Sequence, residues 1–140
     1  MKKHIAVLTV ILGVLFLLTG IAISSEQTTV SPDTLLGKYE GRILIMYRRP
    51  IEHNYSVDIT KIDSKNGQVF LHTYCLECKP TELNLKCELN KEKMPLSFIC
   101  KGEGWHMDYE LDGDSLKANC LAKAGYMYYI KVNKVVDKPK

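Results

Sequence analysis

The chain has 140 residues, a hydrophobic fraction of 46% and a formal net charge of +3 at pH 7. Two of its 19 basic residues, Lys2 and Lys3, precede an apolar run, so the rest of the chain keeps 17 basic residues against 16 acidic ones. This balance argues against a nucleic-acid partner, which would require a basic stripe. The length suits one domain after a short N-terminal segment.

The N-terminal segment is predicted to be a signal peptide or a membrane anchor. A 19-residue run without charge, IAVLTVILGVLFLLTGIAI, extends from residue 5 to 23 behind the two lysines. A basic head before an apolar core is typical of secretory signals, and Ala22 and Ser24 suit cleavage before Ser25. The run is also long enough to span a bilayer as a hydrophobic helix. We expect residues 1–24 to direct export, and any membrane contact to be made by this segment if it is retained.

The rest of the chain is expected to be periplasmic or extracellular. Residues 25–36 are rich in Ser, Thr and Pro and are predicted to be a linker. Residues 37–136 are predicted to be the folded domain, and residues 137–140 a tail.

Alternation of apolar and polar residues predicts β-strands throughout the domain. In LNLKCEL, residues 83–89, the apolar side chains occupy every second position. The same period recurs at residues 55–59, 105–111 and 126–132, with turn signals between such segments at residues 65–67, 112–115 and 124–125. About eight strands with short links predict an all-β, antiparallel up-and-down meander that closes into a small barrel. A two-sheet β-sandwich is the alternative.

The start of the first predicted strand, LLGKYEG, resembles the opening of lipocalin-like (calycin) barrels, in which a Gly-x-Trp motif begins strand one. Gly37 and Tyr39 match the motif, with Tyr in place of Trp. The closing segment LDGDSLKANCLAKAGYMYYIKVNKV is similar in layout to the final hairpin of small exported barrels. The resemblance implies a barrel, and the family's pocket residues have no counterparts that can be assigned one by one.

The domain contains all five cysteines, and exported cysteines form persistent disulfides. The candidates are Cys75, Cys78, Cys87, Cys100 and Cys120. Around the turn at residues 90–95, the register that places Leu89 opposite Phe98 also places Cys87 opposite Cys100. This register predicts a buried cross-strand bridge, with free core thiols as the alternative.

The Cys75-x-x-Cys78 motif admits three interpretations. Redox catalysis needs the motif at a helix N-terminus, whereas here it follows a predicted strand and precedes a turn. Zinc binding would use Cys75, Cys78 and Cys120 with His72 or Cys87 as the fourth ligand. We expect instead a structural bridge from Cys75 or Cys78 to Cys120, with one thiol left unpaired.

Aromatic side chains are the candidate ligand contacts, because they bring large apolar area and a polar group. The predicted pocket residues are Tyr39, Trp105, Tyr109, Tyr126 and Tyr128. Trp105, the single tryptophan, is expected to face the interior beside Leu116 and Ala118 on the next strand.

No catalytic set is predicted. His106 and Asp108 share an outward strand face, which is typical of a solvated surface. In YRRP, Arg48 and Arg49 stand at the end of a predicted strand, and Pro50 is expected to terminate that strand. They could bind anionic lipid or an acidic partner, or they could keep the strand edge from pairing with another chain.

These observations predict an exported, non-catalytic binding barrel without a cofactor, whose partner is a small apolar ligand or a protein. A cell-envelope structural or inhibitor-like interaction module is one alternative. A thiol-based metal-binding protein is the other.

Overall fold

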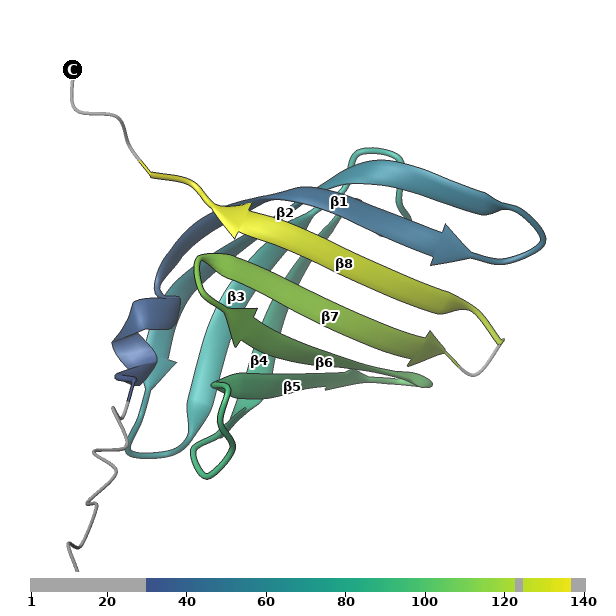
Figure 1. The fold of residues 1–140 in the computed structure, drawn as a ribbon. Helices are drawn as coiled ribbons and strands as arrows, with labels where there is room; N and C mark the ends of the chain where they lie inside the picture. The colour runs from purple at the N-terminus through teal and green to yellow at the C-terminus, as the bar shows by residue number, and fades with distance from the viewer. Residues whose placement is uncertain (1–29, 123–124, 137–140) are drawn as a thin grey trace, which may run out of the picture.

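A computed structural model describes residues 30–122 and 125–136, which form a closed antiparallel barrel (Figure 1). Its eight strands are β1 (Gly37–Met46), β2 (Pro50–Asp63), β3 (Gln68–Tyr74), β4 (Glu82–Asn90), β5 (Ser97–Gly102), β6 (Trp105–Asp112), β7 (Ser115–Ala122) and β8 (Met127–Lys134). Each strand pairs with the next one in the chain, and β8 pairs with β1. The predicted all-β meander and barrel are therefore confirmed, and the sandwich alternative is wrong.

The strands form where the sequence alternates, because successive side chains of a strand point to opposite faces of the sheet. In β4, Cys87 and Leu89 are buried while Lys86 and Glu88 are exposed. β2 is longer than expected, since Pro50 begins this strand instead of ending the one before it. A proline is tolerated at the first residue of a strand.

The barrel has two unlike ends. At the closed end lie the β2–β3, β4–β5 and β6–β7 turns together with a short 3-10 helix, η1 (Pro32–Leu35). Leu35 is fully buried, and its carbonyl accepts a hydrogen bond of 3.0 Å from the Tyr39 hydroxyl. The structured domain therefore begins within the segment predicted to be a linker. At the open end lie the β1–β2 turn, the loop from residue 75 to 81, the β5–β6 turn and the β7–β8 link.

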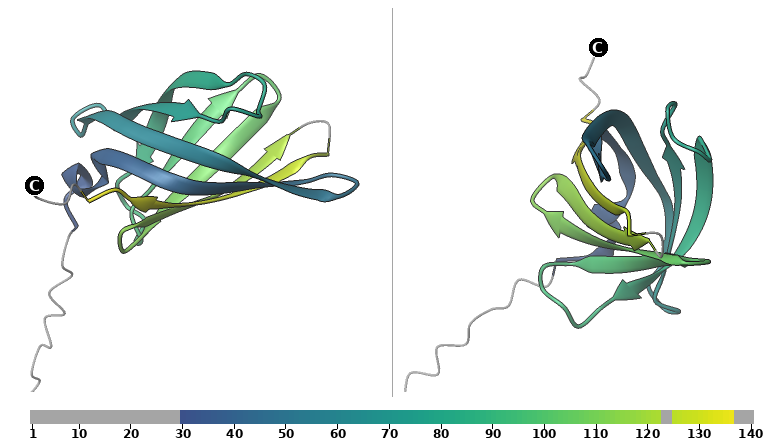
Figure 2. Two further views of the ribbon diagram at one scale, coloured as in Figure 1. Left: turned by 90° about the horizontal axis from the view of Figure 1, so that it is seen from above. Right: turned by 90° about the vertical axis from the view of Figure 1, so that its right-hand side faces the viewer.

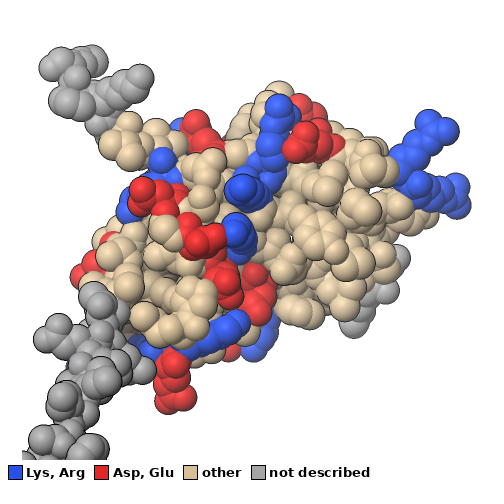
Figure 3. All heavy atoms as spheres, in the orientation of Figure 1, with Lys and Arg blue, Asp and Glu red and all other residues tan. Residues whose placement is uncertain are grey.

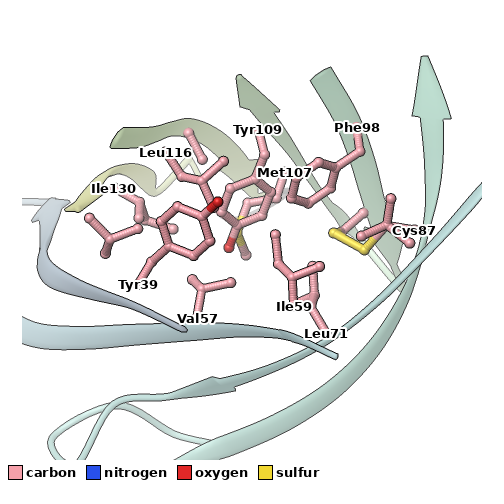
Figure 4. Close-up of a cluster of buried hydrophobic side chains, with 14 of the residues drawn as sticks. Tyr39, Val57, Ile59, Leu71, Cys87, Phe98, Met107, Tyr109, Leu116 and Ile130 are labelled. Carbon is pink, nitrogen blue, oxygen red and sulfur yellow. A yellow bond between two sulfur atoms is a disulfide. The ribbon is translucent and has the colours of Figure 1, made fainter. Parts of the chain in front are cut away.

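The closed half of the interior is packed with side chains (Figure 4). Phe98 and Tyr109 are fully buried and stack with ring centroids 4.8 Å apart. Tyr39, Val57 and Leu116 fill the space around them. Among the described residues, every buried side-chain nitrogen or oxygen has a hydrogen-bond partner. These residues thus complete a core of their own and make the barrel a self-contained folding unit.

Gly41 permits the contact that closes the barrel. It pairs with Tyr55 of β2 on one side and with Val132 of β8 on the other. A Cβ at this position would lie 2.8 Å from the Val132 Cα, so only glycine allows β8 to approach β1 this closely.

The expected N-terminal signal or anchor, residues 1–24, and the tail, residues 137–140, lie outside the described residues. Within the described part of the chain, no helix has the length and apolar character needed to cross a bilayer.

Candidate functional site: a pocket at the open end

The open half of the barrel interior holds a pocket of about 430 Å³. Inward side chains of seven strands and the 75–81 loop line this pocket. Its strand residues are Ile43, Ile45, Tyr55, Thr73, Leu83, Trp105, Met107, Cys120, Ala122 and Tyr128. Most of these side chains are apolar, and the volume falls within the range of about 300–1,000 Å³ that is usual for small-molecule sites.

The floor of the pocket carries hydroxyl groups. The Tyr55 and Tyr109 hydroxyls lie 3.3 Å apart in a buried hydrogen bond, and the neighbouring Thr73 is also buried. Burial raises the pKa of Tyr55, and it raises the pKa of Tyr109 well above its usual value. Both tyrosines therefore stay neutral at physiological pH and keep a proton that can be donated.

A single free thiol lies in the wall of the pocket. Cys120 on β7 is buried and unpaired. Burial raises the pKa of this thiol, because a thiolate would lose its solvation. The side chain is therefore a protonated, weakly polar part of the wall.

The other four cysteines form two disulfides. Cys87 of β4 and Cys100 of β5 are bridged with their Cα atoms 4.4 Å apart, as the register across the β4–β5 turn predicts. Cys75 is bridged to Cys78, with 5.2 Å between the Cα atoms. Disulfides persist in oxidising compartments, so this pair of bridges indicates an exported protein.

The expected bridge from Cys75 or Cys78 to Cys120 is therefore wrong. The chain turns directly after β3, where the Cys78 N–H donates to the Cys75 carbonyl at 3.1 Å. This turn brings the two cysteines within bridging distance of each other. Cys120 lies on β7, four strands away from β3 in either direction around the barrel.

The predicted zinc ligands do not come together. The sulfurs of Cys75 and Cys78 are bonded to each other, and His72 lies on the outer face with its Nε2 atom 3.6 Å from Glu82. In residues 30–122 and 125–136, no three His, Cys, Asp or Glu side chains are placed to hold a metal ion.

The predicted aromatic residues occupy different places in the barrel. Trp105 and Tyr128 line the pocket, whereas Tyr109 is fully buried behind Tyr55, with the two hydroxyls 3.3 Å apart. Tyr39 lies at the closed end beneath η1, away from the pocket. Tyr126 lies at the rim of the open end, where its ring stacks on Tyr47 with centroids 4.4 Å apart.

Trp105 has other neighbours than those expected. It pairs with Ala122, whereas Leu116 and Ala118 pair with residues nearer the β6–β7 turn. Trp105 is the first residue of β6, so the antiparallel register places it opposite the last residue of β7. Its side chain consequently belongs to the mouth of the barrel.

Of the predicted aromatic residues, only Trp105 and Tyr128 are in the lining, and the prediction missed the rest of the lining, including Tyr55 and the 75–81 loop. Tyr55 was identifiable, because it occupies an inward position in an alternating segment. The 75–81 loop gave no such signal, although it contributes Glu77 and Lys79, the charged residues of the lining. Glu77 lies 3.9 Å from the Nδ1 atom of His53 on β2. The loop is closed at its base, where the Cys75 N–H donates to the Thr81 carbonyl at 2.8 Å.

Comparison with known proteins finds no matching family model, no matching curated protein and no matching solved structure. The geometry of the barrel and its pocket is thus the observation that bears on function.

Proposed function

We propose that this chain is an exported, non-catalytic, calycin-like barrel that binds a small apolar molecule in the pocket at its open end. The pocket carries the proposal: about 430 Å³ inside the barrel, with apolar walls and a hydroxyl-bearing floor. An apolar ligand gains free energy in such a site in proportion to the apolar area removed from water.

The calycin-like assignment is supported at the start of β1. Gly37 is the first residue of this strand, and Tyr39 is fully buried at the position of the family's tryptophan. The two disulfides and the predicted N-terminal signal support a periplasmic or extracellular location.

The floor favours a ligand with one neutral hydrogen-bonding end. The Tyr55 hydroxyl lines the pocket and can exchange a hydrogen bond with an alcohol or amide, with the Tyr109 hydroxyl as its partner from behind. An ionised group would lose its hydration at this depth without a counter-charge. The only carboxylate in the described lining is Glu77, on the loop at the mouth, and the lining contains no histidine. This composition supports binding without acid–base catalysis.

Fluorescence of Trp105 provides the test, because it is the only tryptophan and it lines the pocket. We would titrate the domain with 1-octanol, octanoate and octane, which share a chain length and differ at one end. We expect saturable binding of one molecule per barrel, with octanol binding more tightly than octane or octanoate.

A matched pair of variants assigns that binding to the pocket. Ala122→Phe adds a ring to the lining, whereas Leu121→Phe makes a similar change at the adjacent exposed position. Octanol binding should fall in the first variant and persist in the second. Equal affinities in both variants would contradict the proposal. Absence of saturable binding would instead favour the envelope interaction module.

A further inference from the structure

Apolar side chains are exposed around the mouth of the barrel. Met46, Met127 and Leu121 form one row across β1, β8 and β7, and their exposed fractions are 39%, 44% and 54%. In the next row, Tyr129 of β8 is also exposed. On the 75–81 loop, Leu76 is exposed as well.

The β1–β2 hairpin reaches beyond the other strands (Figure 2, left). Tyr47 and Ile51 flank its tip, and both are more than half exposed. The tip itself carries Arg48 and Arg49, with the Arg48 guanidinium 5.6 Å from the centre of the Tyr47 ring. We call the eight residues Met46, Tyr47, Arg48, Arg49, Ile51, Leu121, Met127 and Tyr129 the mouth surface.

Charge is distributed unevenly over the molecule. Ion pairs among the described residues involve lysines and histidines, and none includes Arg48 or Arg49. Figure 3 shows acidic and basic side chains interspersed over the left half of this face, an uncharged area over much of the right half, and basic side chains at the right-hand tip, where Figure 1 places the β1–β2 hairpin. The mouth surface therefore combines an apolar area with two unneutralised positive charges.

We propose that the mouth surface docks onto an anionic phospholipid bilayer, from which the pocket exchanges its apolar ligand. The ligand exchange rests on the proposed function, whereas the docking does not. Arg48 and Arg49 would contact lipid phosphates, and Tyr47 and Tyr129 would lie at the level of the headgroups, where amphipathic rings are favoured. Met46, Ile51 and Met127 would enter the boundary of the acyl chains.

A membrane fits this surface better than a protein partner does. Met46, Met127 and Leu121 lie on the outer face of three neighbouring strands beside the opening, because they alternate with pocket-lining residues, so a bilayer in contact with them would lie next to the entrance of the pocket. Residues 25–140 carry 17 basic and 16 acidic residues, so attraction to an anionic surface must be local to the arginines. An acidic protein is the competing partner, and vesicle binding distinguishes between the two.

The first test is flotation of residues 25–140 with vesicles. Phosphatidylcholine vesicles with and without phosphatidylglycerol are compared. We expect binding to the anionic vesicles, and a loss of about 25-fold in Arg48→Ser/Arg49→Ser, since each basic residue near an anionic surface contributes about fivefold. Lys65→Ser/Lys91→Ser removes the same charge from exposed turns at the closed end and should bind normally. Equal losses in the two double variants, or no binding by the unchanged domain, would overturn the proposal.

The second test concerns the apolar residues. Met46→Ser/Met127→Ser should also weaken flotation, whereas Val135→Ser/Val136→Ser, at exposed positions near the closed end, should not. Flotation of the Ala122→Phe variant separates docking from ligand binding. A domain that binds octanol without floating would refute docking alone, and one that floats without binding octanol would refute the proposed function alone.

Discussion

The indole of Trp105 lies against the backbone of Gly102, its partner across the β5–β6 turn. A Cβ at position 102 would overlap the Cε2, Nε1 and Cζ2 atoms of the indole. The position of the only tryptophan in the pocket wall therefore depends on the missing side chain of an exposed glycine.

Gly102→Ala should displace Trp105 without unfolding the barrel. The added methyl group occupies the space of the indole, so the ring must move. We expect a shift of the tryptophan emission maximum and weaker octanol binding, while the circular dichroism spectrum stays that of the unchanged domain. Lys101→Ala, at the exposed neighbouring position, is the control. An unaltered emission maximum in Gly102→Ala would contradict this placement of the ring.

Truncation of two aromatic residues should separate the packed half of the barrel from the open half. Phe98→Ala removes a fully buried ring and should cost about 3–5 kcal/mol of unfolding free energy. Trp105→Ala removes a partly exposed ring from a pocket wall and should cost less than Phe98→Ala, but it should reduce octanol binding. Binding in this variant is measured by calorimetry, and stability by urea denaturation. Equal losses of stability would mean that Trp105 belongs to a solid core.

The two disulfides should contribute unequally to stability. Cys87 and Cys100 are 13 residues apart, whereas Cys75 and Cys78 are three apart. Cross-linking a longer loop removes more chain entropy from the unfolded state. For the loop closed by Cys87 and Cys100, the expected stabilisation is about 3 kcal/mol. Cys87→Ala/Cys100→Ala should therefore lower the urea midpoint more than Cys75→Ala/Cys78→Ala does. The reverse order would show that the bridge at the mouth anchors the fold.

Thiol titration of the denatured domain should find one free cysteine per chain. Cys120 is buried and its pKa is raised by burial, so alkylation of the native domain at neutral pH should be slow. Denaturation without a reductant should expose this single thiol, and bound octanol should slow the native reaction further. Peptide mapping of the alkylated protein checks the site. Labelling at Cys75 or Cys78 would show a different disulfide pairing.

The domain should lose stability in strong alkali through its buried tyrosines. Burial raises the pKa of Tyr39 to about 12, and nearby Asp114 adds to the rise. In the unfolded chain this pKa is near 10. The stabilisation is thus fully present below a pH of about 10 and is lost as the pH rises towards about 12. Tyr39→Phe should show a shallower alkaline loss, measured as the urea midpoint against pH. An identical pH profile would exclude Tyr39 as a cause.

Most of the barrel could be predicted from the sequence because strand alternation is a local property. The inward positions of residues 83–89 follow from the period alone, and the Cys87–Cys100 bridge follows from counting across one turn. The partner of Cys75 could not be predicted, since pairing depends on which cysteines the fold brings together. The division of the interior into a packed half and an open half could not be predicted from alternation, because it depends on the sizes of the inward side chains. Large rings fill the closed half, whereas the smaller Thr73, Cys120 and Ala122 leave space near the mouth.

Both ends of the described chain leave the barrel at the closed end. Val30 and Lys134 border the same groove there. A tether at either terminus is therefore attached at the closed end, and the pocket opens at the opposite end of the barrel. If cells retain residues 5–23 as an anchor, the described chain that follows it enters the barrel at the closed end, opposite the entrance of the pocket. A fusion partner or a solid support attached at either terminus would likewise leave the entrance unobstructed.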